Sequence, residues 1–133
     1  MFKNTKTFSS FSVDDSQKAQ EFYGETLGMD INLVEGMEDF GMLELHIEDN
    51  NTIMIYPKPN HEPATFTVLN FPVKDIDDAV DELINRGVKF ERYDEEAFNM
   101  DEKNISRSKK GPEPNIAWFK DPAGNILSVL QDN

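Results

Sequence analysis

The stretch FSVDD at residues 11–15 returns as FPVKD at residues 71–75, 60 positions further along the chain. Each copy closes a segment in which apolar and polar residues alternate, as in a strand, and each ends on an aspartate that can cap a following helix. The helical pattern after each copy stops at a glycine, Gly28 in the first and Gly87 in the second. An internal repeat of this kind predicts two copies of one structural module.

Working outward from the two copies, the same order of elements is expected twice. In the first copy we expect a helix at 16–27 and strands at 7–13, 29–33, 40–47 and 52–56. In the second copy we expect a helix at 75–86 and strands at 65–73, 88–90, 115–120 and 126–130. The fold class is therefore α+β, with two tandem βαβββ modules within a single domain, residues 1–133. Module 1 covers about 5–57, a proline-rich connector 58–64, and module 2 about 65–131.

Composition narrows the functional classes. The chain has 133 residues, no cysteine and a formal charge of −13. It therefore lacks thiolate metal ligands and thiol nucleophiles, and its charge disfavours nucleic acid and anionic membranes as partners. Neither a membrane-spanning apolar run nor a signal-peptide core is present in the sequence, so a soluble, cytoplasmic protein is expected.

Residues 94–112 interrupt the repeat with a long polar segment. Its first part is acidic and its second part is basic, so the two blocks can pair with each other. The simplest expectation is a mobile surface loop, although long loops in small domains are often lids over binding sites. After it, the DPAG stretch at 121–124 predicts a type I turn between the last two strands.

The paired modules, the FYxxxLGM pattern at 22–29 and the ending WFKDPAGN at 118–125 resemble the vicinal oxygen chelate superfamily. That group includes glyoxalase I, extradiol dioxygenases, fosfomycin-resistance enzymes and bleomycin-binding proteins. The resemblance implies a fold in which the two modules form a curved mixed sheet. It also implies a ligand site in the bowl between the sheets, and a homodimer. It leaves the function open, because the fold carries isomerases, dioxygenases, transferases and metal-free drug binders.

Alternation along the strands separates a core face from a ligand face. The core face is expected to carry Phe11, Val13, Leu43, Leu45, Ile53, Ile55, Leu69, Phe71, Val73, Ala117, Phe119, Leu127 and Val129. The expected ligand-binding residues lie on the opposite face: Phe8, Ser10, Glu44, His46, Met54, Tyr56, Val68, Asn70, Trp118, Lys120 and Ser128. The aromatic members can attract a cationic or flat organic molecule. The competing interpretation is that Phe8 and Trp118 fill space as core.

The resemblance also implies where a divalent ion is held in the metal-dependent relatives. The matching positions here are Phe8, Met54, Val68 and Ser128. None offers a carboxylate or an imidazole, the groups that such ions bind, so we expect no metal and no other cofactor.

Glu44 and His46 alternate onto the same face and are candidate catalytic residues, with His46 as a general base assisted by Glu44. The structural interpretation is a hydrogen-bonded His46 near the rim and a Glu44 that is solvated or paired with Lys120. Two residues are too few for a substitute metal site.

Three hypotheses follow. The leading one is a metal-independent binding protein of the glyoxalase/bleomycin-resistance type, which sequesters a small organic molecule, as in antibiotic resistance. The second is an enzyme, either a glyoxalase-type lyase or isomerase similar to lactoylglutathione lyase, or a metal-dependent dioxygenase relative. The third is a protein-interaction domain that uses its acidic surface or the 94–112 segment. Phe2, Met37 and Phe40 are candidates for exposed apolar contacts in the homodimer.

Overall fold

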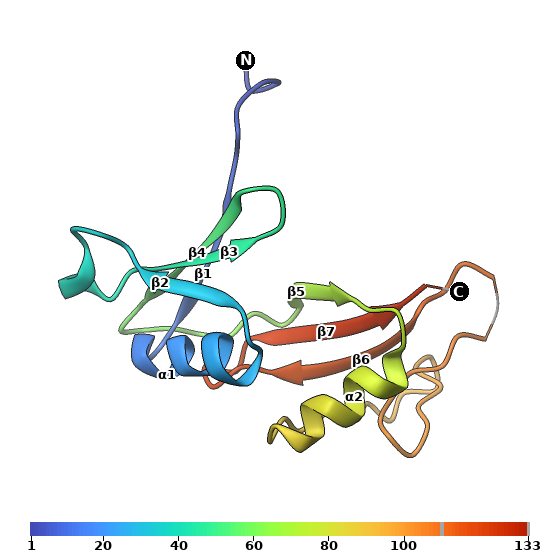
Figure 1. Cartoon of the computed structure of the whole chain (residues 1–133). Coiled ribbons are helices and arrows are strands. Elements are labelled where there is room, and N and C mark those ends of the chain that lie inside the picture. Colours follow the sequence, from blue (N-terminus) through green and yellow to red (C-terminus); the bar gives the residue numbers. More distant parts are fainter. Residues whose placement is uncertain (110, 133) are drawn as a thin grey trace. The chain divides into compact units, whose positions relative to one another are not determined.

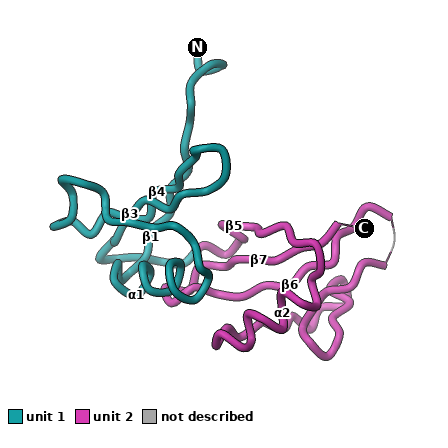
Figure 2. The backbone as a smooth tube through the Cα atoms, viewed as in Figure 1, with its two compact units in different colours: residues 1–63 teal, residues 64–133 magenta. Residues whose placement is uncertain are grey.

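The computed structural model describes residues 1–109 and 111–132. The chain divides into two compact units, Met1–Pro63 and Ala64–Asn133, shown in Figure 2. The division lies within the expected connector at residues 58–64. Each unit contains its own sheet and its own helix (Figure 1). The two units correspond to the two copies of the repeat.

The N-terminal unit has the β-α-β-β-β order that the sequence predicts. Its sheet has the strand order β1-β4-β3-β2, in which β1 is parallel to β4 and the other neighbours are antiparallel. Between β2 and β3 lies a short 3-10 turn, η2. The elements are β1 Ser9–Val13, α1 Ser16–Glu21, η1 Phe22–Thr26, β2 Asp30–Leu33, η2 Glu38–Phe40, β3 Leu43–Ile47 and β4 Asn51–Pro57.

The first helix differs from the expected regular helix at residues 16–27. It is α-helical only to Glu21 and continues as a π-helical turn, η1, in which the Leu27 amide donates to the Phe22 carbonyl at 2.9 Å. The apolar residues Ala19, Tyr23 and Leu27 recur every four residues, whereas an α-helix repeats every ~3.6. A wider turn keeps such side chains on one side, and Tyr23 is fully buried.

The C-terminal unit contains β5 Thr67–Pro72, α2 Ile76–Asn85, β6 Asn115–Lys120 and β7 Ile126–Gln131. Its strand order is β5-β7-β6, with β5 parallel and β6 antiparallel to β7. β5 is an edge strand, which accommodates Pro72 because an edge strand can leave the missing backbone donor of a proline unpaired. Helix α2 packs against β6 and β7 (Figure 1).

The strand expected at residues 88–90 is wrong as a full strand. Only one bridge is present there, between Phe90 and Phe119. The Val88 amide is taken by the Leu83 carbonyl at 2.9 Å, closing the helix end at Gly87 with its φ of 91°. Since this amide serves the helix, β6 gains a single bridge at this point instead of a further strand.

Both helices begin at the aspartates of the repeated stretches, as predicted. The Asp15 carboxylate accepts from the Lys18 amide at 3.1 Å, and Asp75 accepts from the Asp78 amide at 3.0 Å. The same offset therefore places equivalent caps in the two units.

The core of each unit lies between its helix and its sheet. Phe11, Leu69, Phe71 and Val73 are partly exposed, whereas the other residues expected on this face are buried: Val13, Leu43, Leu45, Ile53, Ile55, Ala117, Phe119, Leu127 and Val129. Alternation places their neighbours on the other, open face of each sheet.

The turn at 121–125 is built around a buried carboxylate. Asp121 is 4% exposed, and its Oδ1 accepts from the amides of Ala123 and Asn125, both at 2.9 Å. Its Oδ2 accepts from the Asn125 side chain at 3.0 Å. Gly124 has a φ of 86°, a left-handed conformation that glycine adopts without steric cost. The predicted turn between β6 and β7 is confirmed.

Residues 94–109, within the segment expected to be a mobile loop, contain bridges and a buried side chain. Ser106 forms bridges with Met100 and with Ile116 of β6, and Ile105 is fully buried. The expected pairing between its acidic and basic blocks is present, because Arg107 Nε lies 2.8 Å from Asp101 Oδ2.

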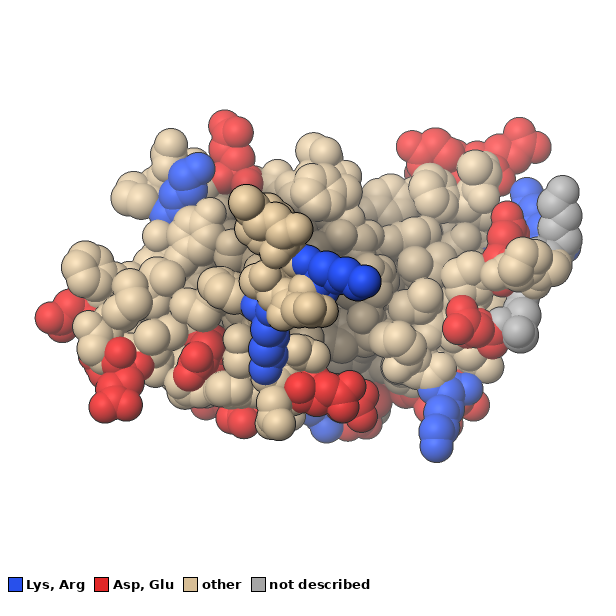
Figure 3. Space-filling model, turned by 90° about the horizontal axis from the view of Figure 1, so that it is seen from above, with Lys and Arg blue, Asp and Glu red and all other residues tan. Residues whose placement is uncertain are grey.

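The surface is acidic overall, in keeping with the formal charge of −13. On the face shown in Figure 3, basic and acidic side chains are interspersed, and most of the visible surface belongs to uncharged residues. Among residues 1–109 and 111–132, no helix has the length and apolar character needed to cross a membrane.

Candidate functional site

The expected ligand-binding residues of the N-terminal unit share the open face of its sheet. The strand register aligns Ser10, Met54, Glu44 and Asn32 in one row across β1, β4, β3 and β2. His46 and Tyr56 lie on the same face one row away on either side, by alternation. Phe8 precedes β1 and is 68% exposed, so this side chain does not fill the core of its unit.

The expected residues of the C-terminal unit also follow one row, from Asn70 through Ser128 to Trp118. Ser128 is fully buried, and its hydroxyl donates to Asn70 Oδ1 at 2.6 Å. Val68 lies where the register between β5 and β7 shifts. Lys120 is exposed and pairs with Glu91 at 3.3 Å.

The open face of the C-terminal unit contains a groove of about 320 Å³. Its floor includes Trp118 of β6 and Ile126 of β7, and its walls come from the start of β5 and from residues 93–98. The lining residues are Thr65, Phe66, Thr67, Tyr93, Glu95, Phe98, Trp118 and Ile126. This volume is at the lower end of the range for small-molecule sites.

Three aromatic rings are in contact where the wall formed by residues 93–98 meets the floor of the groove. The Trp118 ring centroid lies 5.5 Å from that of Tyr93 and 5.3 Å from that of Phe98, with interplanar angles of 81° and 84°. Tyr93 and Phe98 are 5.4 Å apart. Edge-to-face contacts of this kind hold ring faces in fixed orientations. Trp118 is partly exposed and lines the groove.

Negatively charged side chains also lie at the groove. Burial raises the pKa of the Tyr93 phenol above its usual 10.0, and the Glu91 and Glu95 carboxylates add to this shift while Lys120 opposes it. Glu95 itself lines the groove and is exposed. A carboxylate beside aromatic faces is a setting that attracts organic cations.

Sequence reasoning identified Trp118 but missed Tyr93, Glu95 and Phe98. The missed residues come from an irregular segment that lacks strand or helix periodicity. Aromatic residues in an otherwise polar loop were the available signal, since such side chains usually need an apolar partner.

On the open face of the N-terminal unit, Asn32 links the two candidate catalytic residues. Its Nδ2 donates to Glu44 Oε1 at 2.9 Å, and its Oδ1 lies 2.5 Å from His46 Nε2. Because Oδ1 can only accept, His46 carries its proton on Nε2. His46 Nε2 and Glu44 Oε1 are 3.8 Å apart, and both side chains are about one-third exposed. The hydrogen-bonded interpretation of His46 is therefore confirmed, with Asn32 as the partner that the sequence did not indicate.

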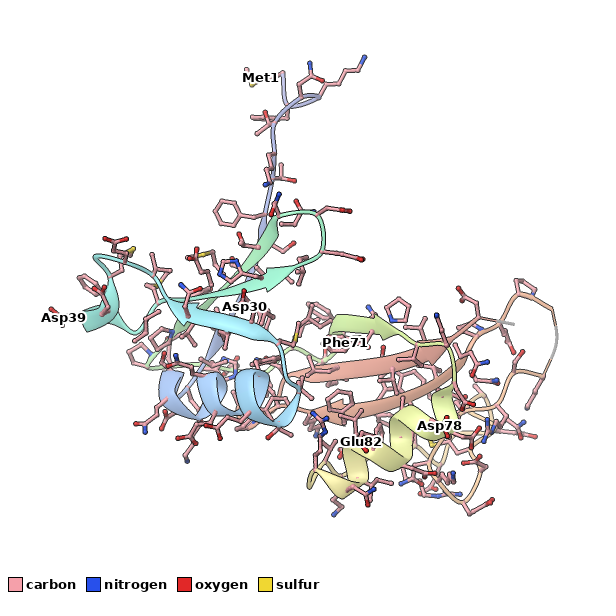
Figure 4. The ribbon with its side chains drawn as sticks, viewed as in Figure 1. Met1, Asp30, Asp39, Phe71, Asp78 and Glu82 are labelled. Atoms are coloured by element: carbon pink, nitrogen blue, oxygen red, sulfur yellow. The ribbon has the colours of Figure 1, made fainter. Side chains whose placement is uncertain are left out.

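A second groove, of about 440 Å³, lies beside α1, η1 and β2. Its lining includes the carboxylates of Glu21, Glu25 and Asp30, the last of which is labelled on β2 in Figure 4. The other lining residues are Gln17, Gln20, Gly24, Met29 and Ile31. Since this set contains no ring, the second groove lacks the stacking surface of the first.

The residues present do not fit the metal of the metal-dependent relatives. Phe8, Met54 and Val68 have no oxygen or nitrogen ligand in their side chains, and the Ser128 hydroxyl is buried against Asn70. Within the part of the chain that the structure describes, no group of three or more histidines, aspartates and glutamates is placed to hold an ion.

The repeated sheets and helices define a class of protein that sequence comparison identifies. The chain matches the Glyoxalase/Bleomycin resistance protein/Dioxygenase superfamily over residues 8–129, and it belongs to that family. A curated relative, "Uncharacterized protein YraH" of Bacillus subtilis (strain 168), is 26% identical over 129 residues, covering 90% of this chain and 91% of the relative.

Two solved structures have the same fold. One is a putative glyoxalase family protein from Bacillus anthracis, with a TM-score of 0.69, 22% identity and full coverage of both chains. The other is TnmS3, an antibiotic binding protein from Streptomyces sp. CB03234, with a TM-score of 0.66, 24% identity and 98% coverage of each chain.

Proposed function

We propose that this protein binds a small, flat organic molecule with a cationic group in the groove of its C-terminal unit. The observation that carries the proposal is the edge-to-face cluster of Tyr93, Phe98 and Trp118 beside Glu95. In this arrangement the ligand ring lies against the aromatic wall and its positive charge faces the carboxylate. Cation–π contacts contribute ~0.5–2 kcal/mol each, depending on desolvation.

Three further facts support binding without chemistry at this groove. The described residues of its lining include one carboxylate and no histidine, cysteine or lysine, so the lining offers its threonine and tyrosine hydroxyls no imidazole or amine as a base. The positions that match the family's metal ligands carry no suitable donor. The fold is shared with a protein described as antibiotic binding, which is consistent with sequestration of an organic molecule.

The test uses the single tryptophan of the chain, Trp118, as a built-in reporter. Proflavine, a planar cation, should quench Trp118 fluorescence saturably, and acridine kept neutral at mildly alkaline pH should bind more weakly. Glu95→Gln should weaken proflavine binding about three- to fivefold, the effect of one exposed charge pair. Glu96→Gln removes the same charge from the adjacent residue, which does not line the groove, and should leave the affinity for proflavine unchanged.

Failure of proflavine and of a wider set of planar cations to change Trp118 fluorescence would count against the proposal. Equal loss of affinity in Glu95→Gln and Glu96→Gln would leave binding in place but remove the cation-specific contact.

A second candidate function is favoured by the Glu44–Asn32–His46 array. Since Asn32 holds the His46 proton on Nε2, the neutral ring presents Nδ1 as a base, which is what a metal-independent lyase or isomerase of glyoxalase type needs. The wild-type protein should then turn over a hemithioacetal of methylglyoxal and glutathione, and the His46→Gln variant should not. Absence of turnover in the wild type rejects this candidate.

We further propose that the protein acts in the cytoplasm as a homodimer, with Phe2, Met37 and Phe40 as contact candidates. Their exposed fractions are 71%, 38% and 70%, which is high for large apolar side chains. Sedimentation equilibrium tests the dimer, and a monomer at micromolar concentration would reject it.

A further inference from the structure

Residues 91–105 form a loop whose two ends are attached to the same edge of β6. At its start, Phe90 bridges to Phe119 and the Glu91 amide donates to the Trp118 carbonyl at 2.8 Å. At its end, Ser106 exchanges two backbone hydrogen bonds with Ile116, at 2.8 and 3.1 Å. The loop therefore leaves and rejoins β6 on either side of Trp118.

One side of this loop carries Tyr93 and Phe98, which we call the aromatic wall of the groove. Tyr93 and Phe98 contact the Trp118 ring, as described above. The Tyr93 amide also donates to Met100 Sδ at 3.3 Å, and Met100 bridges to Ser106. The position of Tyr93 is thus tied to the far end of the loop.

The far end is attached to helix α2 by charged groups. Arg107 donates from Nη2 to Asp77 Oδ1 at 2.8 Å and from Nη1 to Asp77 Oδ2 at 3.2 Å, and from Nε to Asp101 Oδ2 at 2.8 Å. Lys103 Nζ lies 3.4 Å from Asp77 Oδ1 and 3.0 Å from Asp81 Oδ1. We call these five residues, Asp77, Asp81, Asp101, Lys103 and Arg107, the α2 anchor.

Asp101 connects the anchor to the loop backbone. Its Oδ1 accepts from the amides of Lys103 and Ile105 at 2.9 and 3.0 Å, and its carbonyl accepts from Arg92 Nη1 at 3.0 Å. Arg92 adjoins Tyr93, so one short path of contacts leads from Asp77 on α2 to the aromatic wall.

We propose that the α2 anchor positions the aromatic wall, so that Asp77 and Arg107 govern access to Trp118 although neither side chain lines the groove. The side chains of the anchor are 33–56% exposed, apart from the 19% exposed Asp101. Salt screens charges in such settings, whereas the ring contacts do not depend on it. Salt should therefore loosen the wall and open Trp118 to solvent. The consequence for ligand affinity rests on the proposed function, but the consequence for Trp118 access does not.

Acrylamide quenching of Trp118 fluorescence tests this inference, because acrylamide is neutral and the chain has one tryptophan. The quenching constant of the wild type should rise as KCl is added. Asp77→Asn should show a raised constant already at low salt, with little further change. The matched control is Asp78→Asn, which removes the same charge from the neighbouring exposed position on α2, labelled in Figure 4. Removing one such ion pair should raise the fraction of molecules with an open wall about two- to fivefold.

Wild-type quenching in Asp77→Asn at every salt concentration would overturn the inference, as would equal effects of Asp77→Asn and Asp78→Asn. If Asp77→Asn fails to fold, hydrogen exchange of residues 92–99 in the wild type decides: salt must speed it, and salt-independent exchange overturns the inference. Proflavine titration separates the two proposals. Absence of binding to the wild type ends the proposed function alone, because quenching still reports on the anchor. Unchanged quenching together with normal proflavine binding ends the anchor alone.

Discussion

Arg107 holds Asp77 through two hydrogen bonds of 2.8 and 3.2 Å, between residues 30 positions apart in the chain. The guanidinium fork matches the carboxylate, which is the strongest geometry for such a pair. This contact ties the irregular segment after α2 back to the helix that precedes it. We expect this contact to affect the stability of the fold, the pH dependence of that stability and the structure of the groove.

Asp77 should make the protein less stable in acid. Hydrogen bonding from Arg107 holds the pKa of this carboxyl below its usual 3.8, although partial burial works against the shift and Lys103 adds to it. The stabilisation is therefore present above pH 3.8 and is lost as the pH falls below 3.8 through the lowered pKa. At neutral pH, Asp77→Asn should lose about 0.5–1 kcal/mol of unfolding free energy, a modest value because the pair is partly exposed.

Urea unfolding of the two proteins along a pH series measures this. The difference between wild type and Asp77→Asn should narrow as the carboxylate becomes protonated. A difference that is constant down to strongly acid pH would show that the charge of Asp77 is not what stabilises the fold.

Ile105 should contribute to stability as a core residue even though it lies in a long loop. Its side chain is fully buried, so Ile105→Ala should cost about 2–4 kcal/mol through lost burial and the cavity left behind. Ile84 of α2 is 48% exposed and provides the matched control, for which the same substitution should stay within about 0.5 kcal/mol. Urea unfolding compares them, and similar losses in both variants would mean that the loop is not part of the folded core.

The fold was predictable where local pattern determines structure. The FSVDD and FPVKD stretches predicted two strand-to-helix transitions and their capping aspartates, Asp15 and Asp75, because capping depends on residues within one turn. The alternation of β3, β4 and β6 predicted which side chains are buried, since the period of a strand is two.

The site was less predictable, because its wall depends on contacts between distant residues. Tyr93 and Phe98 contact Trp118 because residues 91–105 return to the edge of β6. The loop has no helix or strand periodicity from which this course could be predicted. The strand expected at 88–90 was wrong for a related reason: the Val88 amide is used by the helix end. The partner of Glu44 and His46 was missed because Asn32 is on another strand, aligned through the register.

Asn32 should determine the protonation site of His46. In the wild type, long-range proton–nitrogen NMR spectra should show the neutral His46 ring with its proton on Nε2, because Asn32 Oδ1 accepts that hydrogen. Asn32→Leu removes the acceptor, so His46 should become a mixture of tautomers. His61 is the internal control, since its Nδ1 lies 2.7 Å from Ser12 Oγ and is independent of Asn32. A tautomer of His46 that is unchanged in Asn32→Leu would show that the array does not set the base.

Tyr93 should ionise late and should weaken the fold when it does. Burial raises the pKa of its phenol above 10.0, with a further upward contribution from the Glu91 carboxylate. The unfolded chain releases the phenol proton near pH 10.0 and the folded protein only at higher pH, so alkali favours the unfolded state in this range. Subtracting the ultraviolet titration curve of Tyr93→Phe from that of the wild type isolates the Tyr93 phenol.

Glu91→Gln should move that isolated curve toward lower pH, because it removes the neighbouring negative charge while burial of the ring persists. Glu91 also pairs with Lys120, so Lys120→Met should move the curve the opposite way, since Lys120 lowers the pKa of this phenol. Shifts of opposite sign in the two variants would establish that Tyr93 senses the charges beside the groove. A Tyr93 curve that stays in place in both variants would mean that the phenol does not experience the field proposed to attract a cationic ligand.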